Sequence, residues 1–136
     1  MSATPALRTG VDILEIDRLE EVLERHGRRF LERVYTQNEL AEVEGRPASL
    51  AARFAAKEAV SKALGSGIGE IGWQEIEILR GVKGEPVLRL SGKARWLAEK
   101  QGLQHWAISL SHSRLYAVAV VVASSVVSVS SADESG

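Results

Sequence analysis

With 136 residues, of which 45% are hydrophobic, the chain is the size of one domain with a single compact core. A formal net charge of −1 disfavours bulk binding to nucleic acid, so any charged partner must be met by a local patch. The sequence contains no cysteine, which excludes disulfides, zinc–thiolate sites and a cysteine nucleophile. Because it also shows no apolar run of signal-peptide or membrane-spanning length, we expect a cytoplasmic protein.

The N-terminal part predicts a strand followed by a helix. Residues 7–14 are apolar and partly β-branched, which is typical of a short strand. From Ile16 the apolar residues recur on one helical face, through Leu19 to Phe30. Gly27 interrupts this pattern, and we expect it to kink or break the helix.

Two further helices are indicated next. Thr36 and Glu39 have the spacing of a capping box, so a second helix is expected to begin there. Residues 44–49 predict a loop whose last residue, Ser49, caps a long helix over residues 50–64. Small side chains make that helix thin, which lets another backbone or a ligand approach closely, although alanine is also a good helix former in a packed core; they are Ala51, Ala52, Ala55, Ala56 and Ala59.

The second half predicts short strands around one helix. Residues 73–80 alternate apolar and acidic side chains, as in a half-buried strand, and residues 87–90 form a second strand after a turn. A helix is expected over residues 91–102. Residues 105–122 predict two strands joined by a polar turn, which is a hairpin.

Helices and antiparallel strands therefore mix without a βαβ rhythm, and the predicted fold class is α+β. We expect one domain over residues 1–123. Residues 124–136 are rich in serine and follow no period, so a disordered tail is expected there.

The long helix carries an acid among bases. Glu58 and Lys62 are four residues apart with the glutamate first, the favourable order for a surface ion pair. Arg53 and Lys57 share this spacing, so we expect a broad basic side around one acid. The segment "GSGIG" follows the helix, where the dipole favours a cation and not a phosphate. It is either a C-cap at Gly65 with a flexible turn, or a loop that lets a ligand's phosphates pass close to Lys62.

Asp12 lies between Val11 and Ile13 in the first predicted strand. A carboxylate turned inward from this strand needs a cation, a hydrogen-bond network or a raised pKa. The alternative is an aspartate that caps the following helix or points to solvent. The residue type alone leaves both interpretations open.

A basic stripe runs along the first predicted helix. Glutamates interleaved with it favour an ordinary charged solvent face, held by pairs four residues apart. The alternative is a docking surface for an acidic helix of a partner. The stripe consists of Arg18, Arg25, Arg28, Arg29 and Arg33.

The segment "SLSHSRLY" places Ser111, His112 and Ser113 in the predicted hairpin turn. A nucleophilic serine is disfavoured, because neighbours in a turn rarely point together and no "GxSxG" elbow is present. A polar turn is the simplest interpretation. The functional alternative is a histidine that donates to a ligand phosphate.

Four segments taken in order, "GVDILEIDR", "RFLERVYTQNEL", "RFAAKEAVSKALGSGIG" and "WAISLSHSRLYAVAVVV", resemble the holo-[acyl-carrier-protein] synthases. These are small 4′-phosphopantetheinyl transferases. The resemblance covers residues 10–122. Two signature blocks carry it, Gly-x-Asp at residues 10–12 and Phe-x-x-Lys-Glu-x-x-x-Lys at residues 54–62.

The resemblance implies an antiparallel sheet packed with a long helix, assembled as a homotrimer with active sites between subunits. It implies transfer of the phosphopantetheine arm of coenzyme A to a serine of apo acyl carrier protein. Asp12 and Glu58 would hold Mg²⁺, and Lys62 would contact the phosphate under attack or the leaving one. Glu58, directly or through a water, would be the base for the serine.

Further implied contacts involve the two substrates. Coenzyme A would be bound by Arg53, Lys62, Gly65, Ser66, Gly67, His112 and Ser113. The acidic recognition helix of the carrier protein would dock on Arg18, Arg25, Arg28, Arg29, Phe30 and Arg33.

Two other classes of function stay open. In the first, the chain is a non-catalytic module that binds coenzyme A or a carrier protein. Observing metal-dependent turnover would exclude this class in favour of an enzyme. In the second, the chain is a purely structural trimeric domain with surface ion pairs. Replacing Glu58 by Gln would then leave coenzyme A binding unchanged.

Overall fold

The computed structural model describes residues 6–126 and confirms the predicted α+β class. In this range five strands form two antiparallel sheets, a three-stranded one in the order β1–β5–β4 and a pair of β2 and β3. The strands are β1 (Leu7–Glu15), β2 (Ile76–Arg80), β3 (Pro86–Leu90), β4 (His105–His112) and β5 (Tyr116–Ser124). The helices are α1 (Ile16–Val34), α2 (Gln37–Val43), α3 (Pro47–Leu64) and α4 (Gly92–Lys100), with a 3-10 turn η1 (Trp73–Glu75).

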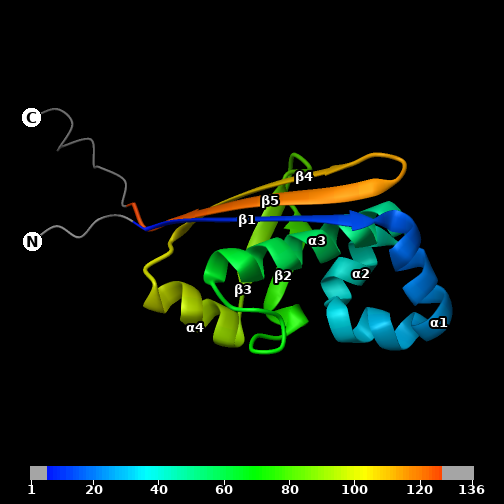
Figure 1. Ribbon diagram of the computed structural model, residues 1–136, viewed down its shortest axis with the longest axis horizontal. Helices are drawn as coiled ribbons and strands as arrows, with labels where there is room; N and C mark the ends of the chain where they lie inside the picture. The colour runs from blue at the N-terminus through cyan, green and yellow to red at the C-terminus, as the bar shows by residue number, and fades with distance from the viewer. Residues whose placement is uncertain (1–5, 127–136) are drawn as a thin grey trace, which may run out of the picture.

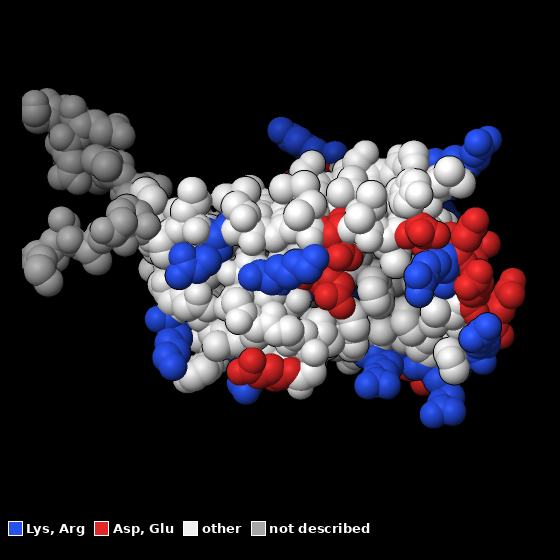
Figure 2. Space-filling model, viewed as in Figure 1, with Lys and Arg blue, Asp and Glu red and all other residues white. Residues whose placement is uncertain are grey.

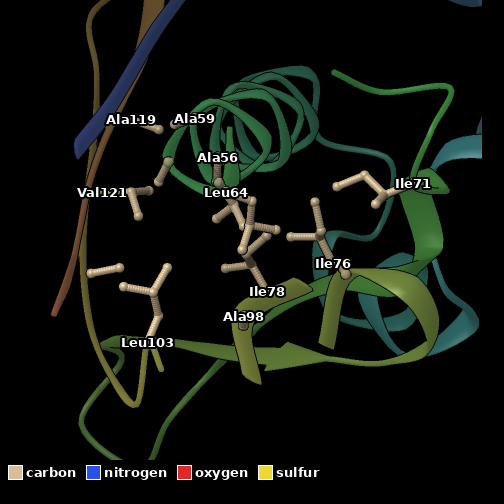
Figure 3. Packing of buried hydrophobic residues seen from close by; sticks show 14 of the residues in the cluster. Ala56, Ala59, Leu64, Ile71, Ile76, Ile78, Ala98, Leu103, Ala119 and Val121 are labelled. Carbon is tan, nitrogen blue, oxygen red and sulfur yellow. The ribbon is translucent and has the colours of Figure 1, made fainter. Parts of the chain in front are cut away.

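The long helix α3 lies between the two sheets, while α1 and α2 occupy one end of the molecule and α4 the other (Figure 1). Figure 3 shows Ala59 of α3 against Ala119 of β5, with Ile76 and Ile78 of β2 on the other side of the helix. Small side chains let the backbone of the sheet approach the helix closely, as the alanines predicted. The helix is thereby enclosed on two sides.

Two local predictions for the helices are confirmed. Gly27 has φ 47° and ψ −123° inside α1, so the helix is kinked there. The Thr36 hydroxyl accepts the main-chain N–H of Glu39, and the Glu39 carboxylate accepts that of Thr36, which completes the capping box of α2.

The predicted start of the long helix is wrong. α3 begins at Pro47, with Arg46 in the cap position, and Ser49 lies inside the first turn. Proline suits this first position, because its missing N–H would have no partner in the helix and its φ angle is already helical. A loop over residues 44–49 therefore ends earlier than expected.

The end of strand β5 is hydrogen-bonded to the N-terminal segment. Ser124 ends β5, and the main-chain N–H of Ser125 donates to the Ala6 carbonyl at 3.0 Å. Residues 127–136, which make up most of the predicted tail, lie outside the described residues. Among residues 6–126, no helix is long and apolar enough to span a bilayer.

Candidate active site

The helix α3 is accessible along one edge only. Between Leu50 and Leu64 every residue is buried except Phe54, Glu58 and Lys62. These three are each four residues apart, so they form a single line along the helix. Because the two sheets and α2 cover its other sides, this line is where α3 can meet a ligand.

Strand β1 brings Asp12 to the same edge. Alternation along the strand turns Gly10 and Asp12 toward α3, while Val11 and Ile13 are exposed on the opposite face. Oδ1 of Asp12 lies 3.2 Å from Nζ of Lys62, which also donates to the Val11 carbonyl at 2.8 Å. The structure therefore turns Asp12 inward, with Lys62 as its cation.

Glu58 is half-buried and electrostatically coupled to both of these residues. Burial raises the pKa of its carboxyl, the charge of Asp12 raises it further, and Lys62 lowers it. Two ionised carboxylates at one edge repel each other. Binding of a proton or of a divalent cation would relieve that repulsion.

The donor set fits Mg²⁺. In proteins this ion is usually held by one or two carboxylates, and water and substrate phosphates complete its six oxygens. Asp12 and Glu58 supply such a pair of carboxylates. Among residues 6–126, no group of three or more His, Asp or Glu side chains could hold a metal ion. The residues therefore suit an ion that shares its coordination with a phosphate ligand.

The prediction that α3 presents a broad basic side is wrong. Lys57 is completely buried, and its Nζ donates to Oε1 of Glu39 at 2.8 Å and to the carbonyls of Trp73 and Ile76. Burial lowers the pKa of Lys57, and Glu39 opposes that shift. Spacing along the helix shows which residues share a side, but the packing of α2 makes this side interior.

Arg53 has a similar environment. It is 5% exposed, and its guanidinium donates to Glu42 at 2.7 Å and to the Ile78 carbonyl at 2.9 Å. The carboxylates of Glu39 and Glu42 also accept the main-chain N–H groups of Ile78 and Arg80. Sequence reasoning identified Glu39 only as a capping residue and missed Glu42, because their three-residue spacing on α2 is an unspecific signal.

A cavity of about 220 Å³ between α3, β2 and the end of β4 brings Arg53 and His112 together. Both were predicted to contact coenzyme A. Ser113, predicted with them, does not line the cavity, and its hydroxyl accepts two main-chain N–H groups of the hairpin turn. Ser111, its neighbour at the end of β4, lines the cavity in its place.

The loop after α3 begins with the predicted C-cap. Gly65 has φ 79°, and its N–H donates to the Lys62 carbonyl at 3.0 Å. The Ser66 hydroxyl oxygen is buried and has no hydrogen-bond partner in the described part of the chain. At Gly67 no atom lies within 4 Å of the place a Cβ would occupy. The loop that follows Lys62 and the cap at Gly65 therefore has open space at Gly67 and one hydroxyl, that of Ser66, without a hydrogen-bond partner in the described residues.

The arginine stripe of α1 is exposed to solvent. Of its five members only Arg28 pairs with an acid within residues 6–126, at 3.3 Å from Glu32. The kink at Gly27 divides the stripe, and Arg18 lies beside a separate hollow near the start of the helix. Figure 2 shows basic and acidic side chains gathered together at the α1 end of the molecule.

A basic hollow on the second part of α1 adjoins the open edge of α3. It is lined by His26, Arg29, Phe30 and Arg33. The Phe30 ring stacks on Phe54 with 6.0 Å between centroids. Phe54 lies one helical turn before Glu58, so the hollow and the carboxylates are connected through one pair of aromatic rings.

Comparison with known proteins identifies the family of this chain. Residues 8–121 match the family model of the 4′-phosphopantetheinyl transferase superfamily. The holo-[acyl-carrier-protein] synthase of Herpetosiphon aurantiacus is 47% identical over 123 residues, which cover 85% of this chain and 97% of the relative. That of Ruminiclostridium cellulolyticum is 51% identical over 120 residues, covering 85% and 90%.

Solved structures lead to the same group of proteins. The crystal structure of the Helicobacter pylori holo-[acyl-carrier-protein] synthase in complex with coenzyme A is 35% identical, with a TM-score of 0.77 over 85% of this chain and 98% of that one. This chain therefore belongs to the 4′-phosphopantetheinyl transferase superfamily and, within it, to the holo-[acyl-carrier-protein] synthases. The resemblance drawn from the sequence is confirmed.

Proposed function

We propose that this protein transfers 4′-phosphopantetheine from coenzyme A to a serine hydroxyl of apo acyl carrier protein, releasing adenosine 3′,5′-bisphosphate. The observation that carries the proposal is the meeting of Asp12, Glu58 and Lys62 at the open edge of α3. Two carboxylates and an ammonium group, contributed by β1 and α3 beside a cavity and a basic hollow, suit a phosphate substrate and a large acidic partner.

Asp12 and Glu58 would hold Mg²⁺, which when bound neutralises charge on the pyrophosphate of coenzyme A. Lys62 is half-exposed and reaches the same edge, so its ammonium group can leave Asp12 for a phosphate oxygen. There it would stabilise charge that develops on the phosphate in the transition state. Replacing one anionic partner by another keeps the ammonium group paired throughout.

Glu58 is the candidate base for the serine hydroxyl. In the chain without metal, burial and the charge of Asp12 raise the pKa of its carboxyl. The carboxylate would take the proton directly or through one water. Phe54, one turn away, would help to exclude bulk water from that edge.

Coenzyme A would extend from this edge along the loop of Gly65, Ser66 and Gly67. The unsatisfied Ser66 hydroxyl offers a donor, and the open space at Gly67 lets a phosphate approach the backbone. The nucleotide end of coenzyme A would lie in the cavity that His112 lines.

The carrier protein would dock its acidic helix on the arginines of α1, because those cations are exposed and mostly without acidic partners in residues 6–126.

We also propose that the protein is a homotrimer with active sites between subunits, as the resemblance implies. The face of the three-stranded sheet that points away from α3 supports assembly, because it is apolar and uncovered in the single chain. Its exposed residues include Leu7, Val11, Ile13, Val120 and Val122. A contiguous apolar face of this kind usually marks an interface.

The direct test is the intact mass of an apo acyl carrier protein after incubation with this protein, coenzyme A and Mg²⁺. We expect a gain of one phosphopantetheine that is lost in EDTA. A gain that persists in EDTA contradicts the metal assignment but keeps the transferase. No gain with several carrier proteins, while coenzyme A still binds the folded protein, identifies the non-catalytic binding module.

A further inference from the structure

The C-terminal end of α1 loses two hydrogen-bond donors to the capping box of α2. If α1 continued, the main-chain N–H of Thr36 would donate to the carbonyl of Glu32, four residues earlier. In the same way, the N–H of Glu39 would donate to the carbonyl of Tyr35. Both N–H groups are used elsewhere, because that of Thr36 donates to the Glu39 carboxylate and that of Glu39 to the Thr36 hydroxyl. The carbonyls of Glu32 and Tyr35 are therefore open to a donor from another element.

The side chain of Gln74, the middle residue of η1, supplies both donors. Its amide nitrogen Nε2 donates to the carbonyl of Tyr35 at 2.9 Å and also to that of Glu32. An amide NH2 group carries two N–H donors, so one side chain satisfies both carbonyls. Gln74 is thus a cap for α1 that comes from a distant part of the chain.

The preceding residue of η1 supports the same part of α1 through aromatic rings. The Trp73 ring packs on Phe54 with 4.7 Å between centroids, and Phe54 in turn stacks on Phe30 of α1. The main-chain carbonyl of Trp73 accepts Nζ of the buried Lys57 at 3.1 Å, which fixes η1 itself. Two consecutive residues of η1 therefore hold the end of α1, one through a ring and the other through main-chain carbonyls.

The second part of α1, residues 28–34, needs this support because it is short. Gly27, with φ 47°, interrupts the helix before it, and Tyr35 ends it, so this part has only about two turns. A helix of that length has little stability of its own, and contacts with the rest of the protein decide its orientation. Three of the four residues that line the basic hollow lie on it: Arg29, Phe30 and Arg33.

We propose that Gln74 is a positioning residue for the carrier protein, because its cap holds the arginines of the basic hollow in the orientation that an acidic helix requires. This rests on the proposed transferase function and deepens its docking step. A partner that binds an ordered surface avoids the entropy cost of ordering it. Without the cap, that cost would fall on binding of the carrier protein alone, since Asp12, Glu58 and the cavity at His112 belong to other elements.

The test measures steady-state kinetics of the wild type, Gln74→Met and Gln101→Met, with carrier protein and coenzyme A varied in turn. Methionine has about the length of glutamine and no N–H donor. The Gln101 amide is a matched control, because it caps the carbonyls of Leu64 at 2.9 Å and Leu97 at 3.3 Å, at the ends of α3 and α4.

We expect Gln74→Met to raise the KM for the carrier protein about three- to tenfold. Its kcat and its KM for coenzyme A should stay within about twofold of the wild type, because only the docking surface loses order. Gln101→Met should leave the KM for the carrier protein unchanged. An equal rise in the control, or a rise of both KM values in Gln74→Met, overturns the positioning role.

A triple variant tests whether the effect of Gln74 passes through the basic hollow. When Arg29 and Arg33 are already replaced by Glu, Gln74→Met should raise the KM for the carrier protein by less than about twofold, because residues that act through one surface are not additive. The full rise in that background would show a general structural effect and overturn the proposal.

Hydrogen exchange measured by mass spectrometry tests the cap independently of turnover. The main-chain amides of residues 28–35 should exchange about threefold faster or more in Gln74→Met than in the wild type, and at the wild-type rate in Gln101→Met. Unchanged exchange in Gln74→Met overturns the proposal. A wild type without turnover contradicts the transferase function, whereas faster exchange in Gln74→Met would still support the cap.

Discussion

Gly10 of β1 faces the main-chain carbonyl of Ala59 on α3 so closely that an added Cβ would lie 1.9 Å from the carbonyl oxygen. The contact is between two backbones, which no side-chain rotation can relieve. It brings the strand close enough to the helix for Asp12, two residues on, to reach Lys62. The glycine of the Gly-x-Asp block is therefore explained by steric fit.

Replacing Gly10 by Ala should destabilise the protein by about 3 kcal/mol or more, because α3 has to shift away from β1. Urea denaturation measures the loss. Gly67→Ala is the control for stability, because nothing lies within 4 Å of its Cβ position. A Gly10→Ala variant as stable as that control would contradict the packing described here.

Replacing Glu58 by Gln should abolish turnover and stabilise the metal-free protein at pH 7. The raised pKa of Glu58 means that its neutral form is favoured in the folded state, so its ionisation lowers stability. The gain from the substitution should shrink as the pH falls through the folded-state pKa and be lost below the pKa of an unfolded glutamate. Calorimetry from pH 4 to 8 tests this. Glu20→Gln, at an exposed site on α1, should show no such trend. Destabilisation by Glu58→Gln at pH 7 would rule the explanation out.

Replacing Lys57 by Met should cost about 3–5 kcal/mol of unfolding free energy. The substitution leaves the buried Glu39 carboxylate without its cation and the carbonyls of Trp73 and Ile76 without a donor. Guanidinium denaturation measures the loss. Lys100→Met on the surface of α4 is the control, and its effect should be a few tenths of a kcal/mol. Equal losses of unfolding free energy in Lys57→Met and Lys100→Met would mean that the buried pair of Lys57 and Glu39 contributes nothing to stability.

Replacing Val120 by Glu should break the proposed trimer. Val120 is 43% exposed in the single chain and lies opposite Val11 on the apolar sheet face, where a charge would be buried by assembly. Light scattering coupled to size-exclusion chromatography gives the mass. Val82→Glu, at a fully exposed turn position, should keep the mass of the wild type. A monomeric wild type is the result that removes this proposal.

Replacing both Arg29 and Arg33 by Glu should lower kcat/KM for the carrier protein at least about tenfold and weaken its dependence on salt. The KM for coenzyme A should stay unchanged, because the basic hollow on α1 is separate from the cavity at His112. The control is Arg95→Glu on α4. An equal loss in the control would indicate a general charge effect and not a docking surface.

The sequence by itself determined the family, the α+β class and the identity of the candidate residues Asp12, Glu58 and Lys62. It could do so because these features depend on residue type at fixed short spacing: the capping box of Thr36 and Glu39, the kink at Gly27, and the four-residue interval between Glu58 and Lys62. The start of α3 was predicted wrongly at residue 50, although Pro47 signals it, since proline favours the first turn.

Only the tertiary structure decided which charges are available. Lys57 and Glu58 are neighbours in the chain, yet one is buried and the other lies on the open edge of α3, because α2 and β2 cover one side of the helix and not the other. Likewise Arg53 is neutralised by Glu42 while Arg80 is not, and no local pattern distinguishes them. Burial and pairing depend on contacts between segments far apart in the chain, which residue spacing does not encode.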